Sequence, residues 1–506
     1  MEVLQVTTAT TTAVRRDTLV VFAGLLLVMF LGALDQTIMA TALPTIAGDL
    51  GGLSELTWVI TVYVLAAAAT TPVWGKLSDL LGRRGLLRTA LAIFLVASAL
   101  SGIAQSIGEL IAFRTLQGVG AGGVMTLAMA TVGDIVAPRE RGRYQGYIQA
   151  VFVLASIAGP LLGGVLVDHV SWRWVFYVNV PIGLAAFGLL GRQPAPAAQR
   201  RGARIDVLGA ILLASAVSAG LLVTVWGGDR YAWASTQVLA LAIVAVALAV
   251  GFVWQERRAA EPVLPLRLFQ DRVFVVVSAA AFLATLSLFA AVVFLPLFLQ
   301  LVTGATATTS GLLVLPMLLA STFSTIVSGR LMTRAGRYKV FPMIGFALMS
   351  AGLALLATLD TSSGRASAML YMAVFGLGFG LTTQVLIVAV QNAVDRRELG
   401  TATASVNLFR ALGGSVGVAV YGAVFAAGLR YALPRHVPGG ASSIDAHGIQ
   451  GSPDRIRMLA APMRHGVAAS VADALHSVFL VATPIAVAGL LVVLFLSERP
   501  LRKEMS

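Results

Sequence analysis

Long apolar stretches recur along the whole chain and limit what it can fold into. We count fourteen of them, over residues 18–41, 56–75, 86–105, 109–132, 145–167, 173–191, 205–226, 235–254, 273–300, 309–329, 340–358, 366–390, 400–428 and 474–496. A helix needs about 20 apolar residues to cross a bilayer. Only 12% of the residues are charged, roughly half the fraction found in soluble domains. The sequence therefore predicts an all-α polytopic membrane protein with fourteen transmembrane helices.

Arginine and lysine residues gather in every second connection between these stretches. The intervening short connections hold few, namely Arg173, Arg230 and Arg365. Because basic loops stay in the cytoplasm, we expect a multi-pass protein of the cell inner (plasma) membrane with both termini cytoplasmic. A loop over 429–473 is the exception, since it is basic yet predicted outside. We therefore attribute the net charge of +13 to the basic loops that set the orientation of the chain in the membrane. No basic stretch is interleaved with aromatic residues, which argues against nucleic-acid binding.

An internal repeat divides the chain. The segment that begins Gly75-Lys76-Leu77 and ends at Gly82-Arg83 has a counterpart that begins at Gly329 and ends at Gly336-Arg337, and Thr333 replaces Asp79 in the second copy. Repeats of this kind are typical of transporters, in which the substrate binds near the midplane between the halves. We therefore predict a six-helix bundle over 1–191, a linker with two extra transmembrane helices over 192–272, and a second six-helix bundle over 273–506 that carries the outer loop.

Asp35 and Arg114 are charged residues inside apolar stretches, where a charge is energetically costly and usually serves a function. The first span runs outward and the fourth runs inward, so both side chains should lie at a similar depth in the outer half and could pair. The sequence suggests that Asp35 loads a proton from outside and releases it to the cytoplasm. The alternative is a static ion pair that fixes two helices to each other.

The turn after the second span is a candidate cytoplasmic gate. Asp79 could face the positive end of a helix, and Arg83 could pair with Asp134 at the end of the fourth span. Such contacts would exist only while the cytoplasmic side is shut. The alternative is a solvated turn that only sets topology. The gate residues predicted from the sequence are Gly75, Asp79, Gly82, Arg83, Arg84 and Asp134.

A glycine-rich run and several polar or aromatic residues in the spans complete the candidate sites. Gly159, Pro160, Gly163 and Gly164 form either a pliable seam between alternating states or a tight static contact. The candidate cavity residues are Gln117, Gln149, Phe152, Phe294, Gln384 and Asn407. Packing or lipid contact is the competing role for any single aromatic residue. Arg410 either snorkels to the cytoplasm or lines the cavity.

Several kinds of chemistry find no support in the sequence. The chain has no cysteine, which excludes disulfides and thiolate metal sites. The five histidines show no metal-ligand spacing, and no Gly-Lys-Ser/Thr phosphate motif supports ATP binding. No catalytic constellation or signalling domain stands out. We therefore expect neither an enzyme nor a receptor, and no cofactor or metal.

The motifs resemble those of the major facilitator superfamily, and within it the fourteen-helix drug:proton antiporter family. The resemblance covers residues from about 18 to 496. It rests on Gly75-x-Leu77-x-Asp79-x-x-Gly82-Arg83-Arg84, Leu34-Asp35-Gln36-Thr37 with Ala42-Leu43-Pro44, Arg114-Thr115-x-Gln117-Gly118, Gly159-Pro160-x-x-Gly163-Gly164, and Trp172-Arg173-Trp174-x-Phe176-x-x-Asn179-x-Pro181. The fourth-helix motif is the one linked to proton coupling in such relatives, and the fifth-helix motif is the one typical of antiporters.

This resemblance implies an exporter of hydrophobic or amphipathic, often cationic, small molecules that is driven by the proton gradient and works by alternating access. We expect the protein to be a monomer. The later spans show no second embedded acid, which disfavours divalent cations as substrates. Two alternatives on the same fold stay open. One is an exporter or flippase of a lipid or cell-envelope precursor. The other is a nutrient importer, against which the glycine-rich fifth span argues.

Overall fold

The computed structural model describes residues 2–50, 56–136, 140–191, 206–228, 230–305, 307–437 and 461–501. The first helices are α1 (Glu2–Leu50), α2 (Leu56–Leu81), α3 (Arg83–Gly102), α4 (Ile107–Ile135), α5 (Arg141–His169), α6 (Trp174–Tyr177) and α7 (Asn179–Leu190). They are followed by α8 (Val207–Trp226), α9 (Thr236–Glu256) and the short η1 (Leu266–Gln270). The last are α10 (Arg272–Leu297), η2 (Phe298–Val302), α11 (Ala307–Leu313), α12 (Leu315–Ala335), α13 (Val340–Ala357), α14 (Arg365–Ala393), η3 (Arg396–Glu398), α15 (Leu399–His436) and α18 (Ala461–Leu494).

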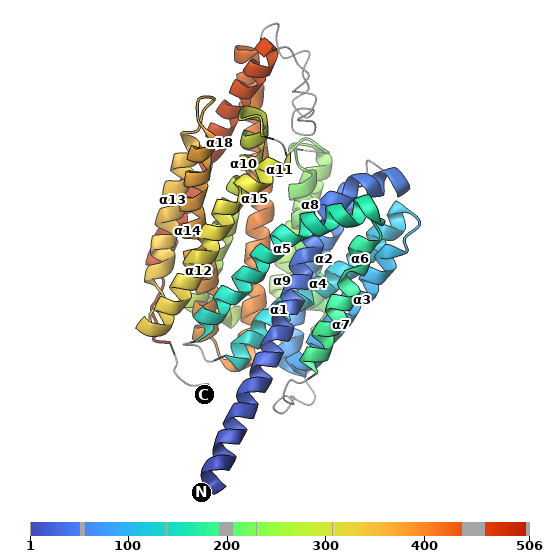
Figure 1. Cartoon of the computed structure of the whole chain (residues 1–506), viewed down its shortest axis with the longest axis vertical. Coiled ribbons are helices and arrows are strands. Elements are labelled where there is room, and N and C mark those ends of the chain that lie inside the picture. Colours follow the sequence, from blue (N-terminus) through green and yellow to red (C-terminus); the bar gives the residue numbers. More distant parts are fainter. Residues whose placement is uncertain are drawn as a thin grey trace.

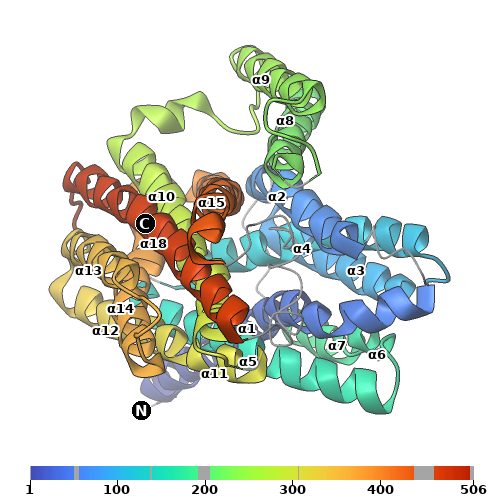
Figure 2. The same ribbon diagram turned by 90° about the horizontal axis from the view of Figure 1, so that it is seen from above.

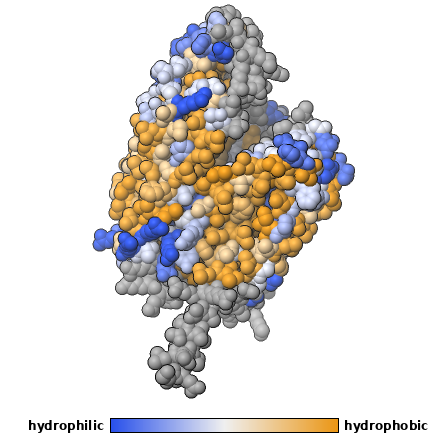
Figure 3. All heavy atoms as spheres, viewed as in Figure 1, coloured by the Kyte–Doolittle hydropathy of each residue, from blue (hydrophilic) through white to orange (hydrophobic). Residues whose placement is uncertain are grey.

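The helices agree with the predicted set of membrane-spanning segments. Thirteen of those described are long and apolar enough to cross a bilayer, and Trp174–Leu190 adds a shorter apolar segment built from α6 and α7. On the face shown in Figure 3, apolar side chains form a broad band across the middle of the molecule, with polar residues towards its two ends. This band is the surface that acyl chains would cover. The predicted all-helical membrane fold is confirmed.

Two groups of helices stand side by side, α1–α7 and α10–α18 (Figures 1 and 2). Helices α8 and α9 lie at one edge, where α8 packs on α2. Both chain ends lie on one side of the molecule (Figure 1), where the Tyr338 hydroxyl donates to the Ser497 carbonyl at 2.9 Å. We call this the terminal side. A large buried apolar cluster fills the second group, and smaller clusters fill the first.

The structure corrects two predicted boundaries. Helix α2 continues to Leu81, so Gly75 and Asp79 are helical and only Gly82, at φ 92°, forms the turn. The predicted loop over 429–473 is helical through His436 and again from Ala461. In both places the helix is longer than its apolar stretch, because the apolar residues cover only the part of the helix that lies within the bilayer. The part of this loop over 438–460 lies outside the described residues.

The two groups meet through glycines on the terminal side. Gly75 of α2 packs on Gly400 of α15, whose carbonyl oxygen would lie 2.8 Å from an added Cβ. Gly329 of α12 packs on Gly142 of α5 in the same way. The two copies of the sequence repeat thus make equivalent contacts. Five helical turns above Gly400, on the same face, Val418 is 42% exposed. The close approach of α15 to α2 therefore lies on the terminal side, and it does not extend about five turns along α15 to Val418.

We expect Gly329→Ala to prevent this close approach. Its new Cβ would collide with the Gly142 carbonyl, and overpacking of about 1–3 kcal/mol shifts an equilibrium roughly 5- to 150-fold. Because the chain has no cysteine, a single Ser78→Cys label reports on the other contact, where Ser78 is buried. A maleimide should react faster with the double variant Ser78→Cys with Gly329→Ala than with Ser78→Cys alone. Gly85→Ala, whose new Cβ would have no atom of the described chain within 4 Å, should not change the rate. Equal labelling rates in Gly329→Ala and Gly85→Ala would show that the contact of Gly329 with Gly142 does not hold the two helix groups together.

Candidate functional site

Asp35 lies in the first group of helices and is completely buried. Arg114 Nη1 donates to Asp35 Oδ2 at 2.7 Å. Gln117 Nε2 and Asn179 Nδ2 donate to Asp35 Oδ1 at 2.9 and 3.0 Å. The donors come from α4 and α7, so one carboxylate joins three helices. The predicted pairing of Asp35 with Arg114 is present, and we call these four residues the Asp35 network.

The Arg114 guanidinium is as deeply buried as its partner, at 1% exposure. It also donates to the Gln117 side-chain oxygen at 2.8 Å, and it lies 4.1 Å from the centroid of the Tyr63 ring. Arg114 follows the start of α4 by seven residues, which places it about 10 Å below that end. A buried ion pair with these added bonds is a strongly held unit, because removing either partner strands a charge.

Sequence reasoning missed two members of this environment. Asn179 entered only as part of a family motif, with no partner assigned, and Tyr63 was not singled out. Within the described residues, Asn179 Oδ1 is buried and accepts no hydrogen bond. The motif position of Asn179 was the only signal available, because nothing in the sequence specifies that α7 folds back against α1. The site therefore holds an unused acceptor beside a carboxylate.

The glycine-rich run of α5 packs on α1 next to Asp35. An added Cβ on Gly159 would lie 2.7 Å from Thr37 Cβ, and one on Gly163 would lie 3.0 Å from Ile38 Cγ1. Thr37 Oγ1 donates to the Ala155 carbonyl at 3.0 Å. Two other predicted members do not join this contact. Pro160 is exposed, and Gly164 has no atom of the described residues within 4 Å of its Cβ position. The close seam therefore consists of Gly159 and Gly163.

On the terminal side, Asp79 joins the two helix groups. Its carboxylate accepts from the backbone N–H groups of Gly400 and Thr401 at 2.9 and 2.7 Å, and from Thr401 Oγ1 at 2.8 Å. It therefore caps the start of α15, where the helix dipole favours an anion. Arg83 donates to Asp79 at 2.9 Å and also pairs with Asp134. We call Asp79, Arg83, Asp134 and the start of α15 the Asp79 cluster.

The remaining predicted gate residues take other places. Gly75 provides the close approach to α15, and Gly82 provides the turn after α2. Arg84 instead donates to the Gly191 carbonyl at 2.6 Å, at the end of α7, which is a hydrogen bond within the first helix group. The predicted contact of Asp79 with the positive end of a helix is present, and so is the pairing of Arg83 with Asp134.

We expect Asp79→Asn to loosen the start of α15. The amide keeps one acceptor but loses the charge that holds two N–H groups and Arg83, and an N-cap loss amounts to about 0.5–2 kcal/mol. Hydrogen exchange at Gly400 and Thr401 should therefore become roughly 2- to 30-fold faster. Asp360→Asn, on an exposed loop, should leave that exchange unchanged. Unaltered exchange in Asp79→Asn would show that the cap does not hold the two groups together.

The predicted cavity residues fall into three settings. Gln384 Nε2 donates to Gln149 Oε1 at 3.4 Å, and Asn407 Nδ2 lies 3.8 Å from Met129 Sδ, so both contacts cross between the helix groups. Gln117 belongs to the Asp35 network. The two aromatic residues pack within single groups. Phe152 packs against an apolar cluster of the first group, and Phe294 is buried with its ring 5.6 Å from Phe425. Packing is thus their observed role.

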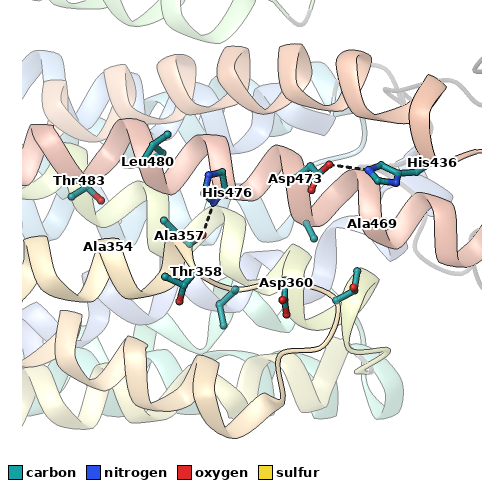
Figure 4. A pocket seen from close by; sticks show the side chains of 13 residues that line it. Ala354, Ala357, Thr358, Asp360, His436, Ala469, Asp473, His476, Leu480 and Thr483 are labelled. Carbon is teal, nitrogen blue, oxygen red and sulfur yellow. Dashed lines mark hydrogen bonds and ion pairs between the residues drawn. The ribbon is translucent and has the colours of Figure 1, made fainter.

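Two further features lie on the side opposite the termini. A cavity of about 580 Å³ between α13, α15 and α18 contains His436, Asp473 and His476, but none of the predicted site residues (Figure 4). At the end of α1, Asp49 accepts from Trp172 and Arg173, and these hydrogen bonds hold the pKa of Asp49 below its ordinary value. Neither feature touches the Asp35 network.

Comparisons with known proteins agree with this architecture. Residues 25–418 match the model of the Major Facilitator Superfamily. The chain is 38% identical over 504 residues to the multidrug transporter protein MdtP of Bacillus subtilis, covering 94% of this chain and 92% of that protein. It is 39% identical over 496 residues to an uncharacterized MFS-type transporter of Mycobacterium tuberculosis, covering 96% of this chain and 70% of that one.

Among solved structures, the proton:xylose symporter XylE superposes with a TM-score of 0.61 at 15% identity, over 96% of this chain and 97% of that one. At that identity the likeness shows the fold alone. The family match and the two sequence relatives go further. The chain belongs to the Major Facilitator Superfamily and is a multi-pass membrane secondary transporter, not an enzyme.

Proposed function

We propose that the protein is a proton-coupled exporter of hydrophobic or amphipathic small molecules. The observation that carries this proposal is the Asp35 network, a fully buried carboxylate that joins α1, α4 and α7 through one cation and two amides. A carboxylate inside a membrane helix is an energetically costly feature whose usual use is ion or proton transfer. Exchange of substrate for protons needs a titratable group that takes up a proton from one side of the membrane and releases it to the other.

Protonation of Asp35 changes each of its contacts. It removes the negative charge that holds Arg114 and turns an acceptor oxygen into a donor. A half-turn of the Asn179 amide would bring its unused Oδ1 towards that new donor. Arg114 would keep the Gln117 oxygen and the Tyr63 ring. Proton loading therefore loosens the bond between α1 and α4 and gives the neutral carboxyl a partner. The adjoining α1–α5 seam at Gly159 and Gly163 is the surface along which α1 can shift.

The terminal side is the cytoplasmic side in this proposal, because the basic connections gather there. The glycine contacts and the Asp79 cluster then close the cytoplasmic entrance, and the structure corresponds to a state that faces outward. Opening to the cytoplasm requires the Asp79 carboxylate to leave the start of α15. The Asp79 cluster is therefore proposed as a gate, and the region between the two helix groups on the opposite side as the outward path.

Export of small molecules is supported by the relatives, since MdtP is named a multidrug transporter. The test uses proteoliposomes with an imposed proton gradient and no ATP. A fluorescent amphipathic dye should accumulate on the side that export would fill, and an uncoupler should abolish accumulation. Dye movement unaffected by the uncoupler would exclude proton coupling. Movement of labelled phospholipid between leaflets, with no dye transport, would instead support lipid or envelope-precursor export.

A further inference from the structure

Arg410 is a charge inside a membrane-spanning helix with no partner among the described residues. It lies in α15, eleven residues after Leu399, or about 16 Å along the helix axis. No hydrogen bond, ion pair or aromatic contact of its guanidinium occurs in the described part of the chain, and its side chain is partly exposed. An extended arginine side chain is too short to reach the terminal side from that depth. Snorkelling therefore does not explain it.

No acidic residue of the neighbouring helices forms an ion pair with Arg410 in the described part of the chain. Helix α15 packs against α2, α4, α8, α10, α14 and α18. Of these, α8, α10 and α14 contain no Asp or Glu, and neither does α15. The other three helices contain four acids, and each of these has a partner other than Arg410. Asp79 caps α15, Asp134 pairs with Arg83, and Asp473 lies 2.9 Å from His436. The fourth, Glu109, accepts from the Gln105 backbone N–H in the first turn of α4.

The position of Arg410 on α15 places it beside the space between the helix groups. Thr403, Asn407 and Arg410 follow the spacing of one helix face. Thr403 accepts from Gln391 of α14 at 3.1 Å, and Asn407 contacts Met129 of the first group. Arg410 is the next residue along this face, about one turn beyond Asn407 and almost three turns beyond the Gly400 contact on the terminal side. The Asp35 network lies elsewhere, and its acid is already paired with Arg114.

We propose that Arg410 binds the anionic group of the exported substrate, so that the preferred substrates are amphipathic organic anions such as carboxylates. An unpaired cation in a membrane protein gains most from an anion that the chain itself does not supply, and a guanidinium holds a carboxylate through two parallel hydrogen bonds. The surrounding spans are apolar and would accept the rest of the molecule. This inference deepens the proposed export function and rests on it.

The test compares two ligands with one apolar body, 1-pyrenebutyrate and its uncharged amide, in fluorescence titrations of the purified full chain. Wild type should bind the acid roughly tenfold or more tightly than the amide. Arg410→Gln should lose this preference while binding the amide as before, and Arg410→Lys should keep part of it. Arg430→Gln, an exposed cation of the same helix, should behave as wild type.

Three results would overturn the inference. They are no preference for the acid in wild type, an unchanged preference in Arg410→Gln, and loss of amide binding in a monodisperse Arg410→Gln protein. The last would make Arg410 a structural residue. Because binding is measured without a proton gradient, failure of proton coupling would not alter these readings. A chain that binds the acid through Arg410 but moves no protons would refute the export proposal alone.

Discussion

Asp35→Asn should abolish transport driven by a proton gradient and leave substrate exchange intact. Asparagine keeps the shape of the side chain and can still accept from Arg114, but it cannot gain or lose a proton. The proposed substrate contact at Arg410 does not include the Asp35 network, so substrate binding should be retained. In proteoliposomes, gradient-driven uptake should fall to the level of protein-free vesicles, whereas exchange of labelled for unlabelled substrate should continue.

Asp49→Asn is the matched control. Asp49 lies in the same helix and pairs with an arginine at 3.0 Å, but its side chain is 51% exposed. This variant should keep gradient-driven transport at the wild-type rate, because a surface ion pair contributes at most about 1 kcal/mol. If Asp35→Asn transports against the gradient as well as Asp49→Asn does, Asp35 only fixes the helices together and another group carries the proton.

Arg114→Gln should be the most destabilising change in the Asp35 network. It leaves a buried carboxylate without its cation, and breaking a buried pair in this way costs about 3–5 kcal/mol. The folded variant escapes part of this penalty by holding a proton on Asp35, which it releases on unfolding. Its stability should therefore fall as pH rises, since the folded state then binds more protons than the unfolded state. Thermal unfolding in detergent between pH 5 and 8 measures this.

The double variant Asp35→Asn with Arg114→Gln separates charge from packing. With neither charge present, no buried ion remains unpaired, and much of the stability lost in Arg114→Gln should return. The pH dependence should also disappear. A double variant as unstable as Arg114→Gln would mean that Arg114 acts through its contact with Tyr63 and the Val59 carbonyl, which lies 3.4 Å from its Nε, and not through Asp35.

The sequence was sufficient to predict the membrane fold and the charged pair, for clear physical reasons. Apolar stretches of bilayer length admit few structures besides transmembrane helices. An acid and a base at similar depth inside such helices are driven together, because neither is stable alone in that environment. The contact of Asp79 with a helix start followed from the same electrostatic argument, although the helix could not be named before the structure placed α15 there.

Contacts that depend on tertiary packing were beyond sequence reasoning. Asn179 meets Asp35 only because α7 returns to α1, and no periodicity in the sequence specifies that approach. Phe294 looked like a cavity residue but packs on Phe425, since aromatic residues suit a helix interface as well as a cavity. Gly164 belongs to the glycine run of α5 yet points away from α1. One residue along a helix rotates a side chain by about 100°, enough to leave the contact.

The most direct test of Asp35 as the proton carrier is to measure protons released when substrate binds. Purified protein in weakly buffered detergent is mixed with a transported amphipathic substrate, and a pH indicator records the change. Wild type should release protons in proportion to bound substrate, and Asp35→Asn should bind substrate yet release none. Equal proton release from both proteins, with equal binding, would contradict the account and assign the coupling to another group.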